Sequence, residues 1–259
     1  MNKYLSVIAL AARHTIYKVL AVTAVAAAAV GALMVRLPIL EKNEAYLVID
    51  PLYVPRDLDV TPSRSLATLA CLAGFLVIMF LLSRNGCGFG TKSDYTVCRL
   101  RVDEGKASLL WAAYYTVCIL LYWAAMAAVC YWAVGRRVAM LAADPRWGYC
   151  AGPQSRMLTF YGSPFLHHLL PLADIAVWAE DVAFAALCGA AAMEFSRRQR
   201  KGRISVAPLF AAGMTAAGFF FPMGSWINII FLFIPIACLV VTILKRGDET
   251  DGPTFPAVS

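Results

Sequence analysis

Three ionisable residues recur at intervals of seven in an apolar stretch: His167, Asp174 and Asp181. A straight helix would bring residues at this spacing to one face. An ionised carboxylate at the bilayer centre costs at least about 2.5 kcal/mol, so such residues face a cavity or a partner. The spacing therefore indicates a proton or cation path, or the polar wall of a substrate route.

Two structural interpretations compete with this path. Asp174 is expected at the outer membrane surface, and the acids can instead pair with Arg136 or Arg137 in the neighbouring loop. The adjacent histidines, His167 and His168, are more typical of an interfacial pair than of a metal site. Both interpretations stay open at the level of sequence.

Two tyrosines of another apolar run, Tyr115 and Tyr122, are also seven residues apart. In the middle of a membrane helix they can line a path for an amphipathic substrate. Helix packing is the more common role for such residues. Aromatic residues at the ends of the same run are typical of interface anchors.

A near-match to a phosphate-binding loop occurs at Gly86–Ser93, which reads GCGFGTKS. Thr91 stands where the pattern GxxxxGK[ST] needs a glycine, and its Cβ obstructs close approach of a phosphate. The segment also follows an apolar run, whereas a phosphate-binding loop follows a buried strand. We therefore expect no nucleotide site in this chain. No catalytic motif and no cysteine–histidine spacing for zinc occurs, so neither an enzyme nor a bound cofactor is expected.

The composition is that of a membrane protein. The chain has 259 residues, of which 61% are hydrophobic and only 15% are charged, against about 25% charged in soluble domains. Its net charge of +7 lies in short clusters beside apolar runs. That distribution favours loops facing an anionic lipid surface and argues against nucleic acid as a partner.

Six apolar runs reach the minimum length for crossing a bilayer. We predict an all-α fold in which one transmembrane domain covers residues 1–247 and residues 248–259 form a disordered cytoplasmic tail. The predicted spans are residues 19–35, 66–82, 109–134, 169–193, 204–223 and 226–244.

Residues 1–18 carry basic residues on one helical face and apolar residues on another. This pattern indicates an amphipathic helix lying along the membrane surface; the basic region of a signal peptide is the competing interpretation. More Lys and Arg residues fall in the segments on the side of the N-terminus than on the opposite side. The distribution predicts that both termini are cytoplasmic.

The segment Thr91–Ser108 is a charged loop between the second and third spans. Ser93 and Asp94 can start a short helix, and Asp103 with Glu104 can start another. The orientation of the spans places this loop in the cytoplasm. We expect it to receive force from a partner protein.

This layout resembles the permease subunits of type-2 ABC exporters, which combine six spans, a surface helix before the first span and a coupling helix between spans two and three. Their loop often ends in a pattern like L-P-[IV]-S-R-R-K. The corresponding stretch here, Leu100–Lys106, reads LRVDEGK. Leu100, Val102 and Lys106 match, and Asp103 can replace serine as a helix N-cap. A charged residue replaces the proline and a glycine replaces an arginine.

The resemblance implies a separate ATPase chain that binds ATP and Mg²⁺, and a second permease subunit that is identical or related. It also implies residence among the lipids of a bacterial cell membrane. The residues implied to contact the ATPase are Ser93, Asp94, Tyr95, Val97, Arg99 and Leu100. Two alternatives are an ATP-independent carrier or channel that uses the acidic residues of span four, and a membrane scaffold without transport activity.

Overall fold

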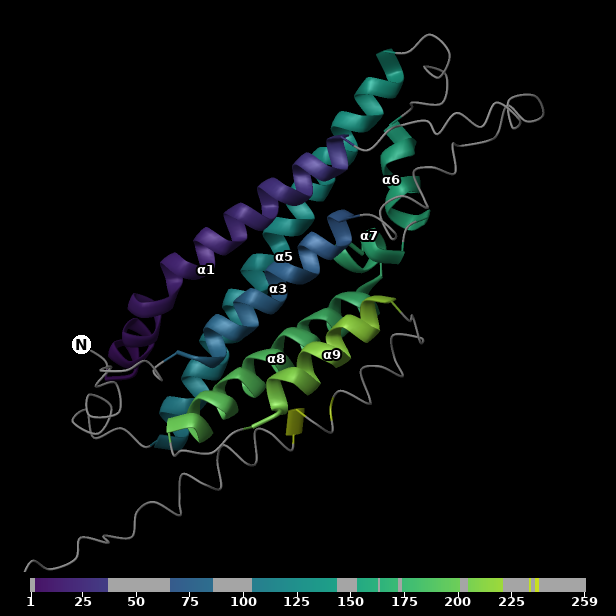
Figure 1. Ribbon diagram of the computed structural model, residues 1–259. Helices are drawn as coiled ribbons and strands as arrows, with labels where there is room; N and C mark the ends of the chain where they lie inside the picture. The colour runs from purple at the N-terminus through teal and green to yellow at the C-terminus, as the bar shows by residue number, and fades with distance from the viewer. Residues whose placement is uncertain are drawn as a thin grey trace, which may run out of the picture.

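The computed structural model describes residues 3–36, 66–85, 104–143, 153–162, 164–171, 174–200 and 205–220, together with residues 233, 236 and 237. Within these ranges the regular structure is helical and no strand occurs (Figure 1). The predicted all-α fold is confirmed for this part of the chain.

Among the described residues, four helices are long and apolar enough to cross a membrane: α1 (Lys3–Arg36), α3 (Leu66–Ser83), α5 (Glu104–Ala143) and α8 (Ile175–Arg200). Several large apolar side chains on α3 are exposed on the outside of the bundle, among them Leu69, Leu76 and Phe80. A soluble protein rarely exposes such a surface, whereas a membrane helix presents it to lipid. These features indicate a multi-pass membrane protein, as predicted.

The two remaining predicted spans are not established. Helix α9 (Ala207–Phe220) is apolar but has 14 residues, which gives a length of about 21 Å against a hydrocarbon thickness of about 30 Å. Residues 221–223 at the end of the predicted fifth span lie outside the described residues, as does nearly all of the predicted sixth span. The total of six spans therefore stays a prediction.

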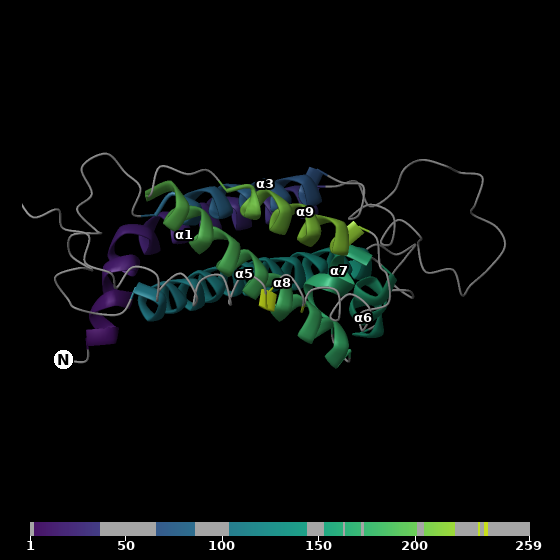
Figure 2. The same cartoon turned by 90° about the horizontal axis from the view of Figure 1, so that it is seen from below.

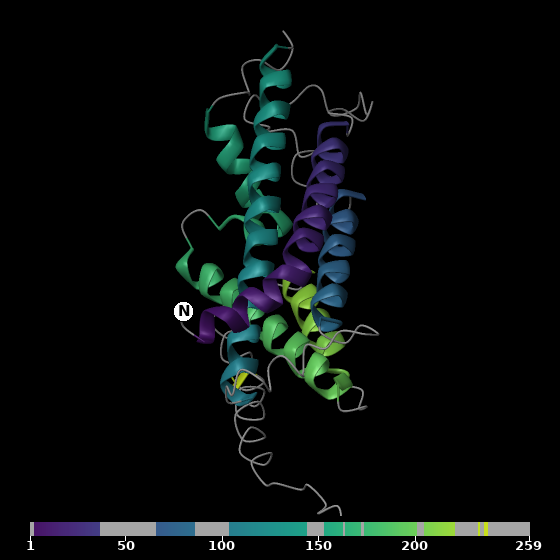
Figure 3. The same cartoon turned by 90° about the vertical axis from the view of Figure 1, so that its left-hand side faces the viewer.

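Helix α1 joins the predicted surface helix and the first predicted span into one element of 34 residues. No proline or glycine interrupts the sequence between Lys3 and Val30, so nothing in the chain breaks the helix there. Its first turns nevertheless run in a different direction from the remainder (Figure 3). The stretch that qualifies as a membrane span, Thr15–Val35, starts four residues before the predicted boundary at Val19.

Helix α5 is much longer than the span predicted at residues 109–134. It begins at Glu104, as the charged start signal predicts, and its 40 residues continue to Ala143. Arg136 and Arg137 therefore lie on a helix and not in an outer loop. The segment between α5 and α8 also contains the short helices α6 (Pro153–Gly162) and α7 (Pro164–Leu169).

The fourth span differs from the predicted range of residues 169–193. Helix α7 ends at Leu169, and α8 begins only at Ile175 and runs to Arg200. Pro171 lies between them and cannot donate the backbone hydrogen bond that a continuous helix requires. Asp174 then caps the new helix, because its Oδ1 accepts a hydrogen bond of 3.0 Å from the backbone N–H of Ala176.

The helices pack as an elongated bundle. Helix α1 packs along α5 and α3, and α8 packs against α5, α9 and α3. Figure 2 shows α1, α3 and α9 along one side, α5 along the other, and α8 crossing obliquely between them. One end of the bundle holds the start of α1, the end of α3, the start of α5 and the end of α8 (Figure 1).

Two glycines allow helices to approach closely. A Cβ at Gly74 on α3 would lie 2.6 Å from the Tyr122 hydroxyl and 2.8 Å from the Ala26 Cβ. A Cβ at Gly189 on α8 would lie 2.8 Å from the Ala112 carbonyl oxygen of α5. Small residues at helix crossings are a common solution in membranes, where packing drives association.

Candidate functional site

A cavity of about 80 Å³ lies inside the bundle and is bordered by α3, α5, α7, α8 and α9. A single water needs about 10–15 Å³ on this measure, so the cavity has the volume of several waters. Its lining is almost wholly apolar. The aromatic members of the lining are Phe75, Tyr122, Trp123, Phe165 and Phe184.

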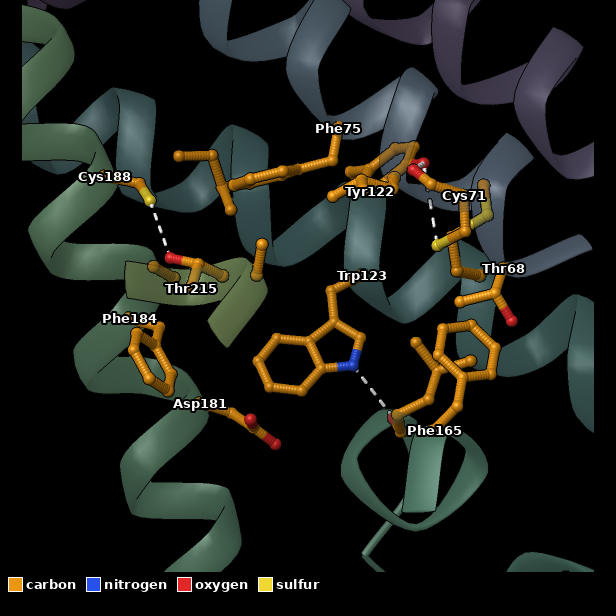
Figure 4. Close-up of a pocket in the computed structure, with 16 residues that line it drawn as sticks. Thr68, Cys71, Phe75, Tyr122, Trp123, Phe165, Asp181, Phe184, Cys188 and Thr215 are labelled. Carbon is orange, nitrogen blue, oxygen red and sulfur yellow. Dashed lines mark hydrogen bonds between the residues drawn. The ribbon is translucent and has the colours of Figure 1, made fainter. Parts of the chain in front are cut away.

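Of the described residues that line this cavity, Asp181 is the one with an acidic side chain. It is 1% exposed, and neither of its carboxylate oxygens has a hydrogen-bond partner among the described residues. Figure 4 shows the carboxylate extending from α8 towards the space beside the Trp123 indole. A buried polar group without a partner is unusual and calls for an explanation.

The sequence of α8 explains why Asp181 is buried. The helix carries many small residues and packs against α5 and α9, so most of its side chains are buried. Asp181 lies six residues after Ile175, or about 9 Å along the helix axis. The adjacent Glu180 is also fully buried but does not line the cavity, because successive residues point about 100° apart on a helix.

The Trp123 side chain separates the cavity from a second, outer space. Its Nε1–H donates a hydrogen bond of 2.9 Å to the carbonyl oxygen of Leu169, which ties α5 to α7. The same indole borders an apolar groove of about 450 Å³ that also includes Tyr131 and Trp178. Trp123 is therefore a shared wall between groove and cavity.

The two tyrosines singled out in the sequence have different surroundings. The Tyr122 hydroxyl donates a hydrogen bond of 2.6 Å to the carbonyl oxygen of Cys71, and its ring borders the cavity. Tyr115 is completely buried, does not line the cavity, and has its ring 5.9 Å from that of Tyr114. Of the pair, only Tyr122 reaches the candidate site.

The predicted single face of His167, Asp174 and Asp181 is wrong. His167 belongs to α7, and the chain leaves helical geometry before Asp174, so no straight helix connects the three residues. Asp174 is exposed and serves as a helix cap. This outcome matches the interpretation of Asp174 as a surface residue. Asp181 alone enters the cavity, and it forms no ion pair with Arg136 or Arg137 in the described part of the chain.

The histidine pair lies on α7, next to the cavity but outside it. His167 is half-buried with its ring 5.5 Å from that of Tyr161, and His168 is buried. Burial lowers the pKa of His168, and the neighbouring His167 lowers it further. Among the described residues no group of three potential ligands for a metal ion occurs.

The six residues expected to contact an ATPase, Ser93 to Leu100, lie outside the described residues, as does the near-match to a phosphate-binding loop. The structure does describe where this loop leaves α3 and where it returns at Glu104. At the exit, the Ser196 hydroxyl of α8 donates a hydrogen bond of 2.7 Å to the carbonyl oxygen of Asn85. Two residues to either side of Ser196 on α8, Arg198 Nε donates to Glu194 Oε1 at 2.6 Å.

Sequence reasoning missed this polar cluster at the end of α3 and α8, and it missed Trp123 as a wall of the site. Nothing in the spacing of Asn85 and Ser196 signals that they meet, because they are 111 residues apart. Comparison with family models, curated proteins and solved structures finds no match for this chain.

Proposed function

We propose that this chain is the membrane-spanning permease subunit of an ATP-driven transporter of the ABC class, working as an exporter. The observation that supports the proposal most directly is the Ser196–Asn85 hydrogen bond. It joins α8, which borders the cavity, to the end of α3, from which the chain continues towards the predicted coupling loop.

The proposed mechanism uses α8 as a lever. Ser196 and Asp181 are 15 residues apart on one helix, or about 22 Å along its axis. A force applied to the chain after Asn85 would reach Ser196 through the hydrogen bond. It would then tilt or shift the part of α8 that carries Asp181 and Phe184, and so change the shape of the cavity.

Energy in this proposal comes from another chain. ATP and Mg²⁺ bind to a separate ATPase subunit, and two permease subunits share the translocation path. Both termini are cytoplasmic in this arrangement. The ends of α3 and α8 and the start of α5 then face the ATPase, which agrees with the exposed Arg84 and Lys106 at this end of the bundle.

Copurification from the native host tests the proposal. We expect the tagged full chain to bring down an ATPase with an intact phosphate-binding loop in stoichiometric amount. Arg99→Glu should reduce both this recovery and ATP-dependent export. Arg136→Glu, at the opposite end of α5, is the matched control and should leave both unchanged. Normal assembly and export by Arg99→Glu would show that the coupling assignment is wrong.

A second candidate is an ATP-independent carrier or channel, and one observation favours it. Asp181 is a buried carboxylate without a hydrogen-bond partner among the described residues, as expected of a group that binds an ion during transport. In liposomes that contain only this chain, this candidate predicts solute flux driven by an ion gradient. Asp181→Asn should abolish that flux. Flux that requires an added ATPase would decide for the first candidate.

A further inference from the structure

We infer that the cavity beside Asp181 is a binding site for a small organic cation, such as a protonated alkylamine. The ammonium group would contact the Asp181 carboxylate, and the apolar body would lie among the aromatic side chains. The bound cation would also be the transported solute, and only this last statement rests on the proposed transport function.

The Asp181 carboxylate is the charged group of the proposed site. Asp181 is 1% exposed, points into the cavity, and both of its oxygens lack a hydrogen-bond partner among the described residues (Figure 4). A ligand that carries N–H donors and a positive charge would satisfy both oxygens and form a charge-assisted hydrogen bond. An anionic or purely apolar ligand would leave them unsatisfied.

Aromatic rings line the same cavity as Asp181. Tyr122 and Trp123 come from α5, and Phe184 lies three residues after Asp181 on α8, so that it faces the same side of the helix. The hydrogen bond from Trp123 to Leu169 holds the indole in a fixed orientation at the cavity wall. Aromatic faces attract cations, and the attraction reaches about 2 kcal/mol or more at desolvated sites.

A bare divalent metal ion fits this cavity less well than an organic cation does. Calcium requires six to eight oxygen ligands, and magnesium also prefers oxygen ligands, yet the cavity lining is almost wholly apolar. The Thr215 hydroxyl is already engaged, since it donates to the carbonyl oxygen of Ala211 at 2.9 Å and lies 3.2 Å from the Cys188 sulfur. An organic cation needs one carboxylate and an apolar surface, which is what the cavity offers.

Isothermal titration of the purified full chain in nanodiscs tests the inference, with n-butylammonium as the probe and n-butanol as its neutral counterpart. We expect the wild-type chain to bind n-butylammonium about tenfold or more tightly than n-butanol. Asp181→Asn should abolish this preference. Asp174→Asn, which changes an exposed carboxylate outside the cavity, should retain it.

Equal affinity of the wild-type chain for the two probes, or no binding of n-butylammonium, would overturn the inference without reference to any variant. Retention of the preference in a folded Asp181→Asn protein would overturn it as well. The titration contains no ATPase and no ATP. A failure here is therefore distinct from a failure of the ATPase copurification, which tests the transport mechanism.

Discussion

The hydroxyl of Ser196 on α8 and the carbonyl oxygen of Asn85 after α3 are joined by a hydrogen bond of 2.7 Å, and both residues are buried. Ser196→Ala should lower the free energy of unfolding by about 1 kcal/mol, because the carbonyl oxygen loses this partner. Thermal unfolding in detergent measures the change.

Ser83→Ala is the matched control for this bond. Ser83 is equally buried near the same end of the bundle, but its hydroxyl has no hydrogen-bond partner among the described residues. Its removal should be neutral or slightly stabilising. Equal losses in the two variants would mean that the Ser196 hydrogen bond contributes nothing specific to stability.

Replacing Asp181 with leucine should stabilise the chain while it removes the candidate site. A buried polar group without a partner costs about 1–3 kcal/mol, and the adjoining cavity leaves room for the leucine methyl groups. The expected result is a higher midpoint of thermal unfolding.

Replacing Asp174 with leucine should instead lower the midpoint of thermal unfolding. Asp174→Leu removes the cap of α8 and should cost about 1 kcal/mol. A loss of stability on Asp181→Leu would mean that Asp181 has a structural partner in the folded chain, and this result would contradict the candidate site.

The stability of the chain should fall in mildly acidic solution because of His168. Burial, followed by the neighbouring His167, lowers the pKa of His168 below its ordinary value of 6.5. The unfolded chain then binds a proton more readily than the folded chain, so the free energy of unfolding declines as the pH falls below about 6.5. Above that pH both states are neutral at this residue and its contribution is constant.

Unfolding by denaturant at about pH 7.5 and about pH 5 measures this contribution. His168→Gln should lose less stability between the two conditions than the wild-type chain. His167→Gln should retain most of the loss, since burial of His168 is the larger cause. An unchanged pH dependence in His168→Gln would assign the effect to other groups.

The close helix contact at Gly74 predicts that adding one methyl group there lowers the stability of the chain. Gly74→Ala would place a Cβ within 2.8 Å of the Ala26 Cβ, whose backbone must move to accommodate it. We expect a loss of about 1–3 kcal/mol from overpacking. Gly213→Ala on α9 is the control, because a Cβ there meets no atom within 4 Å. The control should gain up to about 1 kcal/mol from helix propensity. Similar changes in both variants would argue against the packing at Gly74.

Sequence was most reliable where an apolar run has sharp polar limits. The span predicted at residues 66–82 agrees with α3 (Leu66–Ser83) because Arg84 and Ser65 bound it. The prediction was less reliable around α8. The apolar run continues on both sides of Pro171, so the sequence did not reveal that the helix is interrupted there. The C-terminal end of α5 was missed for the opposite reason, since the helix continues through the polar residues Arg136 and Arg137 as far as Ala143.

The candidate site was only partly predictable. An acid in an apolar helix is expected to face a cavity or a partner, and Asp181 does line the cavity. The spacing argument that joined it to His167 and Asp174 failed, because it assumed one straight helix. The aromatic residues around Asp181 come from four helices, and no pattern along the chain brings Phe75, Trp123 and Phe165 together.

Helix α5 has 40 residues and is therefore about 60 Å long, twice the hydrocarbon thickness of a bilayer. Even at a tilt of about 40° it would span about 46 Å along the membrane normal. It contains no proline. One continuous helix thus extends beyond the lipid. A displacement of Glu104 on one side of the membrane would be transmitted along this helix to Ala143 on the other side.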